Sequence, residues 1–101
     1  MVTIFEQKVY DLCRLVPKGK VTTYREISNA LRGRGQIYRA VGNALNKNPF
    51  APQVPCHRVI NSNGFVGGFV YGTKSKIALL KKEGIEIKNK KIDLKKFLFR
   101  F

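Results

Sequence analysis

A cysteine and a histidine stand side by side at positions 56 and 57, within the run Pro55-Cys56-His57-Arg58-Val59-Ile60. A cysteine sulfur is a nucleophile only as the thiolate, and its free pKa of about 8.5 means that it needs a nearby base or positive charge at neutral pH. His57, the single histidine of the chain, could be that base. The pair indicates an activated thiol; the alternative for His57 is a structural histidine hydrogen-bonded in the core.

The charge of the chain indicates what this thiol could meet. Twenty Lys and Arg residues stand against six Asp and Glu residues, which gives a net charge of +14 on 101 residues. So high a charge on so small a surface predicts attraction to a polyanion, and nucleic acid is the first candidate. A basic protein from a lysine-rich proteome is the simpler alternative.

Length and composition predict a single folded domain over residues 1–101, which we expect to be monomeric. No signal peptide or membrane-length apolar run is visible, so we expect an intracellular, cytoplasmic protein that keeps Cys13 and Cys56 as reduced thiols and does not bind membranes. Metal-ligand spacings are missing from the sequence, which predicts no metal site and no cofactor.

Three helices are predicted in front of the Cys-His pair. The first begins at a capping box, Thr3 to Glu6, and runs until Pro17. A second begins with the same pattern at Thr23 and breaks at Gly33-Arg34-Gly35, and a third carries an apolar stripe over residues 37–45. Two short helices joined by a glycine-containing turn are typical of a helix-turn-helix, although any three-helix domain gives a similar pattern.

The second half of the chain is expected to be more irregular. Pro49, Pro52 and Pro55 predict a stiff segment in front of Cys56. Residues 58–60 and 65–66, separated by an Asn-Ser-Asn-Gly turn, predict a β-hairpin. A helix is expected over 73–83, followed by a basic tail, 88–101, whose last residues should pack back on the domain. The predicted fold is therefore mainly α with a small β-hairpin.

Motifs in the same order carry a family resemblance. The run Val54–Ile60, preceded by Arg39–Ala44 and Asn48-Pro49 and followed by Glu83-Gly84, resembles the O6-alkylguanine-DNA alkyltransferases, also called methylated-DNA-protein-cysteine methyltransferases. The resemblance spans roughly residues 3–87. It implies a winged helix-turn-helix-like DNA-binding and catalytic domain, the C-terminal domain of the family, without the ribonuclease-H-like domain that usually precedes it.

The resemblance implies repair of double-stranded DNA by direct, irreversible transfer of the alkyl group from a flipped-out O6-alkylguanine to Cys56. In that reading Cys56 is the nucleophile and acceptor, His57 is the base that acts through a water, Glu83 orients His57, and Tyr24 donates a proton to the guanine. Taken alone, Glu83 could be a solvated acid or a partner of neighbouring lysines, and Tyr24 a core aromatic.

Further residues are assigned by the same resemblance to two sites. Arg39 corresponds to the arginine finger that takes the place of the flipped base. The other expected DNA contacts are Arg25, Arg34, Ala40, Gly42, Asn43 and Ser62. The expected guanine pocket consists of Asn48, Val59, Phe69, Val70 and Tyr71.

The chain departs from the family pattern at the pocket, and this leaves other functions open. Many members have Tyr at the place of Phe69 and a small residue near Val70 and Tyr71, so the pocket is expected to be narrower. In length the chain resembles the alkyltransferase-like proteins, which flag O6-alkylguanine for nucleotide excision repair without transfer and carry Trp in place of the nucleophile; this chain has Cys56 and no Trp. A non-catalytic lesion-binding protein is the alternative, and a helix-turn-helix regulator with a structural cysteine is a third hypothesis.

Overall fold

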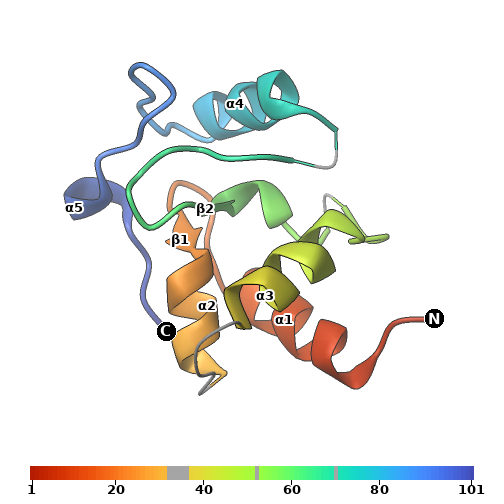
Figure 1. The fold of residues 1–101 in the computed structure, drawn as a ribbon. Coiled ribbons are helices and arrows are strands. Elements are labelled where there is room, and N and C mark those ends of the chain that lie inside the picture. The colour runs from red at the N-terminus through yellow and green to blue at the C-terminus, as the bar shows by residue number, and fades with distance from the viewer. Residues whose placement is uncertain (32–36, 52, 70) are drawn as a thin grey trace.

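The computed structural model describes residues 1–31, 37–51, 53–69 and 71–101, and most of its regular structure is helical (Figure 1). The elements are, in chain order, α1 (Ile4–Arg14), β1 (Thr22–Thr23), α2 (Tyr24–Ala30), α3 (Ile37–Asn46), the 3-10 helix η1 (Cys56–Arg58), β2 (Val59–Ile60), α4 (Thr73–Lys82) and α5 (Leu94–Phe97). The prediction of a mainly helical fold is confirmed. The glycine break between the second and third helices lies outside the described residues.

Capping residues set where the first two helices begin, as their sequence patterns predict. Thr3 Oγ1 accepts from Glu6 N (3.0 Å), and Thr3 N donates to Glu6 Oε1 (2.9 Å), which completes a capping box at α1. Thr23 Oγ1 accepts from Glu26 N (3.1 Å) at the start of α2. The cap at Thr23 matters for the site because it fixes the next residue, Tyr24, as the first of α2.

Two apolar cores lie on either side of β2. The first core is formed by Val9, Tyr10, Cys13, Ile27, Val41, Ala44, Leu45, Val54, Cys56 and Val59. The second core is formed by Val21, Ile60, Val66, Leu80, Ile85, Ile92 and Phe97. Neighbouring strand residues point to opposite faces, so Val59 enters the first core and Ile60 the second. In Figure 1 the segment after β2 runs between α4 and the three N-terminal helices.

The predicted β-hairpin does not form; β2 instead pairs in parallel with β1, with Thr22 opposite Val59 and Thr23 opposite Ile60. The turn after β2 is present, since Asn61 N donates to Phe65 O (3.0 Å), but Phe65 bridges Lys91 in antiparallel fashion. Val59 and Ile60 are buried in different cores, so β2 must lie between the cores. The strand that pairs with it there, β1, comes from a distant part of the chain. Local sequence patterns cannot reveal such a partner.

The C-terminal tail packs against the domain, as predicted. Val21 N donates to Phe97 O (2.9 Å), and Phe99 N donates to Val21 O (2.7 Å). Phe97 is buried in the second core, and α5, which the sequence patterns did not predict, begins at the cap residue Asp93. The helices among the described residues include none that is long and apolar enough to cross a membrane. Both cysteines are free thiols.

Candidate active site

Cys56 begins η1 and is enclosed by the first core. Backbone hydrogen bonds fix the turn around it: Cys56 N donates to Val54 O (2.8 Å), and Arg58 N donates to Pro55 O (2.9 Å). Only 6% of Cys56 is exposed. Because its thiol faces the interior, it can react only with a group that is inserted beside the first core.

A network of hydrogen bonds joins His57, Arg58 and Glu83. His57 Nε2 lies 3.1 Å from Glu83 Oε2. Arg58 donates from Nε to Glu83 Oε1 (2.9 Å) and from Nη2 to Glu83 Oε2 (2.6 Å), and its Nη1 donates to Val16 O (2.9 Å). This bidentate pairing fixes the plane of the carboxylate as well as its position. The Glu83 carboxylate, at the end of α4, is thus held by two side chains of η1.

The pKa shifts of these groups define their charge states. Burial lowers the pKa of His57, and the hydrogen bond and charge of Glu83 only partly oppose it. Burial acts to raise the pKa of Glu83, but hydrogen bonds from Arg58 and His57 outweigh it and hold that pKa below its usual value. At neutral pH the imidazole is neutral and the carboxylate is charged. Since a carboxylate only accepts, the ring proton lies on Nε2, and Nδ1 can take up another.

Cys56 itself is protonated at neutral pH. Burial raises the pKa of its thiol, while hydrogen bonding from Asn48 and the charge of Lys76 act to lower it. Asn48 is buried; its Nδ2 donates to Val54 O (2.9 Å), and its Oδ1 accepts from Phe50 N (2.9 Å). Asn48 therefore ties the end of α3 to the segment that leads into Cys56. Because the Cys56 thiol is protonated, it needs a base before it can react.

Lys76 is a fully buried lysine on α4 that the sequence reading did not single out. Its Nζ donates to the carbonyl oxygens of Val59 (2.7 Å) and Gly68 (2.9 Å). Burial lowers its pKa to about 8, while the Cys56 thiolate acts to raise it. A sequence signal exists: Lys76 shares the inward face of α4 with Leu80, one helical turn later. Its charge is placed where it stabilises a thiolate.

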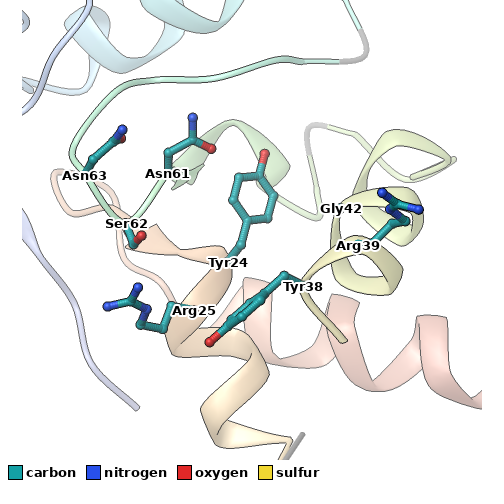
Figure 2. A pocket seen from close by; sticks show the side chains of 8 residues that line it. All are labelled: Tyr24, Arg25, Tyr38, Arg39, Gly42, Asn61, Ser62 and Asn63. Atoms are coloured by element: carbon teal, nitrogen blue, oxygen red, sulfur yellow. The ribbon is translucent and has the colours of Figure 1, made fainter. Parts of the chain in front are cut away.

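Tyr24 lies between this interior and an open groove at the surface. The Tyr24 ring packs against the first core, and burial raises the pKa of its phenol, so that the hydroxyl stays a proton donor at neutral pH. The groove has a volume of about 550 Å³ (Figure 2). Its lining consists of Tyr24, Arg25, Tyr38, Arg39, Gly42, Asn61, Ser62 and Asn63. Five of these were predicted as site residues: Tyr24, Arg25, Arg39, Gly42 and Ser62.

The parallel pairing of β1 and β2 explains why the groove forms at this place. Thr23 lies opposite Ile60, and each is the last residue of its strand. The chain therefore leaves both strands at one edge, where β1 continues into α2 and β2 continues into residues 61–63. In Figure 2 Tyr24 stands between Asn61 on one side and Arg39 of α3 on the other. The hairpin expected from the sequence would not bring these segments together.

The remaining predicted residues occupy several environments. Ala40 and Asn43 are exposed on α3, outside the groove lining. Val59 is buried in the first core with Cys56, and Phe69 packs edge-on against His57, with ring centroids 6.3 Å apart. Tyr71 is exposed and contacts Phe69 in the same manner at 5.5 Å. Arg34 and Val70 lie outside the described residues.

Five residues of the site were not predicted from the sequence. Arg58 belongs to the motif but carried no role there, and Tyr38, Asn61 and Asn63 flank residues that were predicted. The fifth is the buried Lys76. Among the described residues the structure contains no group of three His, Cys, Asp or Glu side chains that could hold a metal ion. The site therefore consists of a buried thiol, a neutral imidazole, a charged carboxylate and a basic groove.

Comparison with known proteins identifies the family. A family model described as the 6-O-methylguanine DNA methyltransferase, DNA binding domain, matches residues 4–85. The chain belongs to this family. The matched domain is a DNA-binding domain over the N-terminal part of this chain, which corrects the description of the chain as the C-terminal catalytic domain; residues 86–101 lie beyond the match.

Individual relatives agree with the family match. The chain is 47% identical over 83 residues to a methylated-DNA-protein-cysteine methyltransferase of Saccharolobus solfataricus, which covers 82% of this chain and 52% of that protein. Mycobacterium tuberculosis OGT, crystallised in complex with DNA, is 40% identical, covers 82% of this chain and 51% of that one, and has a TM-score of 0.78. The chain spans 30% to 52% of the length of the first curated relatives it matches.

A third relative is similar over nearly its whole length. S. pombe Atl1, crystallised in complex with damaged DNA containing O6-carboxymethylguanine, is 34% identical, with a TM-score of 0.84. The similarity covers 96% of this chain and 95% of that one. Because these structures contain alkyltransferase DNA-binding domains, they confirm the predicted fold class.

The buried lysine generates a prediction about stability. Because the pKa of Lys76 falls to about 8 in the folded protein and is about 10.4 in an unfolded chain, the unfolded state binds more protons between these values. The free energy of unfolding of the wild type should therefore rise with pH in this window, by up to about 3 kcal/mol from this group. The Lys76→Met variant should lose that component of the rise. Urea titrations at a series of pH values test this, and equal slopes in both proteins would contradict it.

Proposed function

We propose that the protein repairs DNA by transferring the alkyl group of O6-alkylguanine directly and irreversibly to Cys56. The observation that carries the proposal is the buried Cys56 beside a neutral His57 that is paired with Glu83, next to a basic groove that contains Tyr24 and Arg39. The names of the relatives support the same reaction. We infer that this segment carries both the DNA-binding and the catalytic residues of the family, and that double-stranded DNA is its partner.

The reaction is a displacement at the alkyl carbon. His57, its Nε2 hydrogen-bonded to Glu83, takes the thiol proton at Nδ1 through a bridging water, and the thiolate attacks the alkyl carbon. The S–C bond forms as the C–O6 bond breaks, and the leaving guanine takes a proton from Tyr24. Proton return to Tyr24 from His57 completes the balance, so the products are guanine and the Cys56 thioether. The positive charge of Lys76 stabilises the thiolate while it exists.

The position of Cys56 requires that the damaged base leaves the duplex. The O6 atom of a stacked guanine cannot reach the sulfur of a residue that is only 6% exposed, so the nucleotide must be extruded. Arg39 is exposed on α3 and lines the groove, where it can enter the stack in place of the base. The neighbouring Arg25 and Ser62 are suited to contact phosphates. A thioether is a very poor leaving group, so each molecule reacts once.

Lesion binding without transfer is the second candidate function. It is favoured by the similarity to S. pombe Atl1, which extends over 95% of that chain. The raised pKa of Cys56 is compatible with it, since a protonated thiol does not react unless the base acts. The presence of a cysteine at position 56, in a chain that has no tryptophan, favours transfer. The two functions differ in whether the mass of the protein changes.

Incubation with duplex DNA that contains O6-methylguanine tests the proposal. The intact mass of the protein should increase by one methyl in place of the thiol hydrogen, and peptide mapping should locate the addition on Cys56. Cys56→Ala should retain lesion binding and show no gain. Cys13→Ala is the matched control, because burial raises the pKa of Cys13 to about 12 and its thiol should not react. Tight lesion binding with unchanged mass would reject transfer in favour of the second function.

The small residue at position 42 gives a test of the DNA-binding face. Gly42 lines the groove, and a Cβ added there would meet no atom within 4 Å. Gly42→Leu should therefore place a bulky side chain in the groove and obstruct the approach of DNA, weakening the affinity about tenfold, or about 1.4 kcal/mol. Gly42→Ala, the control for helix propensity, should stabilise the protein by about 0.5–1 kcal/mol. Anisotropy titrations and thermal melts separate the two effects; unchanged affinity in Gly42→Leu would place DNA elsewhere.

Alkylation should destabilise the protein. Cys56 is packed within the first core, and an added methyl must displace its neighbours, at a cost of about 1–3 kcal/mol for overpacking. For a domain of this size the melting temperature should fall by at least about 4 °C. Calorimetry of the methylated protein against protein incubated with undamaged DNA measures the difference. A melting temperature that stays level or rises would show that the site accommodates the product without strain.

A further inference from the structure

A second groove, of about 260 Å³, adjoins the one that contains Tyr24 and Arg39. Two residues, Arg25 and Ser62, line both grooves. The second groove also contains Lys95 and Arg100, which lie beyond residues 4–85, the part matched by the family model. In Figure 2 Arg25 points toward the C-terminal segment. The two grooves thus form one track across the protein surface.

The C-terminal segment is held firmly beside α2. Phe97 is buried in the second core, and backbone hydrogen bonds join Val21 to both Phe97 and Phe99. Thr22 Oγ1 also donates to Phe99 O (3.0 Å). These contacts are made to the residues that lead into Tyr24 and Arg25. The backbone that carries Lys95 and Arg100 is therefore held at a fixed place relative to the first groove.

The charges of this segment favour an anionic partner. Residues 88–101 contain six Lys and Arg residues and one acid, Asp93. Arg100 lies 3.9 Å from Glu26, but its side chain is 76% exposed, and exposed pairs of this kind contribute little. Lys96 is engaged with Glu86 at 2.8 Å and is not part of the groove lining. The C-terminal segment contributes two cations to that lining, Lys95 and Arg100, in addition to Arg25.

We infer that Lys95 and Arg100 extend the DNA-binding surface by contacting phosphates of the same duplex, beyond the base that is extruded. The inference rests on the proposed function, because it takes the first groove as the place where DNA binds. A strand that passes Arg25 continues along the track toward the C-terminal segment. The contacts are made to the sugar-phosphate backbone, so they add affinity without sequence preference.

The salt dependence of DNA binding tests this inference. For each phosphate neutralised, the slope of log K against log salt changes by about 0.9 units. The double variant Lys95→Ala/Arg100→Ala should therefore reduce the magnitude of the slope by about 1.8 units. The matched control is Lys8→Ala/Arg14→Ala, which removes the same residue types from the exposed surface of α1 and should keep the wild-type slope. Affinities are measured by anisotropy on undamaged duplex and on duplex containing O6-methylguanine.

A variant of opposite sign sharpens the test. Glu26 lines the second groove and is the acid nearest Arg100. Glu26→Gln keeps the backbone contact with Thr23 and removes a negative charge from the track, so it should tighten binding to both duplexes. Equal slopes in the two double variants, or no gain with Glu26→Gln, would overturn the inference. Methyl transfer to Cys56 is followed by mass in the same samples, so a failure of the proposed reaction is seen separately as the absence of mass gain in the wild type.

Discussion

The partly buried carboxylate of Glu83 is the constraint on which the site depends. It ends α4, and its oxygens are held by Arg58 and His57 of η1. A carboxylate remains charged away from water only when donors match its oxygens, and removal of one partner of a buried pair is far more costly than the net contribution of the pair. The helix of the second core is thereby fixed to the turn that carries Cys56. The orientation and tautomer of the imidazole follow from the same contacts.

A second constraint, the parallel pairing of β1 and β2, determines where the surface groove forms. Because β1 and β2 are parallel and in register, the start of α2 and residues 61–63 emerge at one edge, and α3 closes the groove. Two strands of two residues each are enough, since both are buried between the cores. Tyr24 belongs to both regions: its ring packs on the first core, and it lines the groove. Tyr24 is thus shared by the groove and by the core that contains Cys56.

Local signals in the sequence predicted much of this and missed what depends on distant pairing. The capping residues Thr3 and Thr23 predicted two helix starts, which the structure confirms, whereas the role of Cys56 as the nucleophile stays a prediction. The hairpin prediction was wrong because the partner of β2 lies 37 residues earlier, and nothing in the pattern around Val59 indicates Thr22. Lys76 could have been found from its place on an apolar helix face. Its two carbonyl partners could not, because they belong to other segments.

In the proposed reaction, burial of Cys56 both protects the unreacted thiol and makes the alkylated product permanent. A thiol whose pKa is raised by burial stays protonated and is a poor target for oxidants and stray alkylating agents. The groups that activate the thiol are its neighbours inside the protein. His57 can take the proton, and the charge of Lys76 favours the thiolate in a medium of low dielectric. After transfer the thioether is uncharged, and the same enclosure keeps out any nucleophile that could remove the alkyl group. One structural feature therefore makes the thiol durable before the reaction and the product permanent after it.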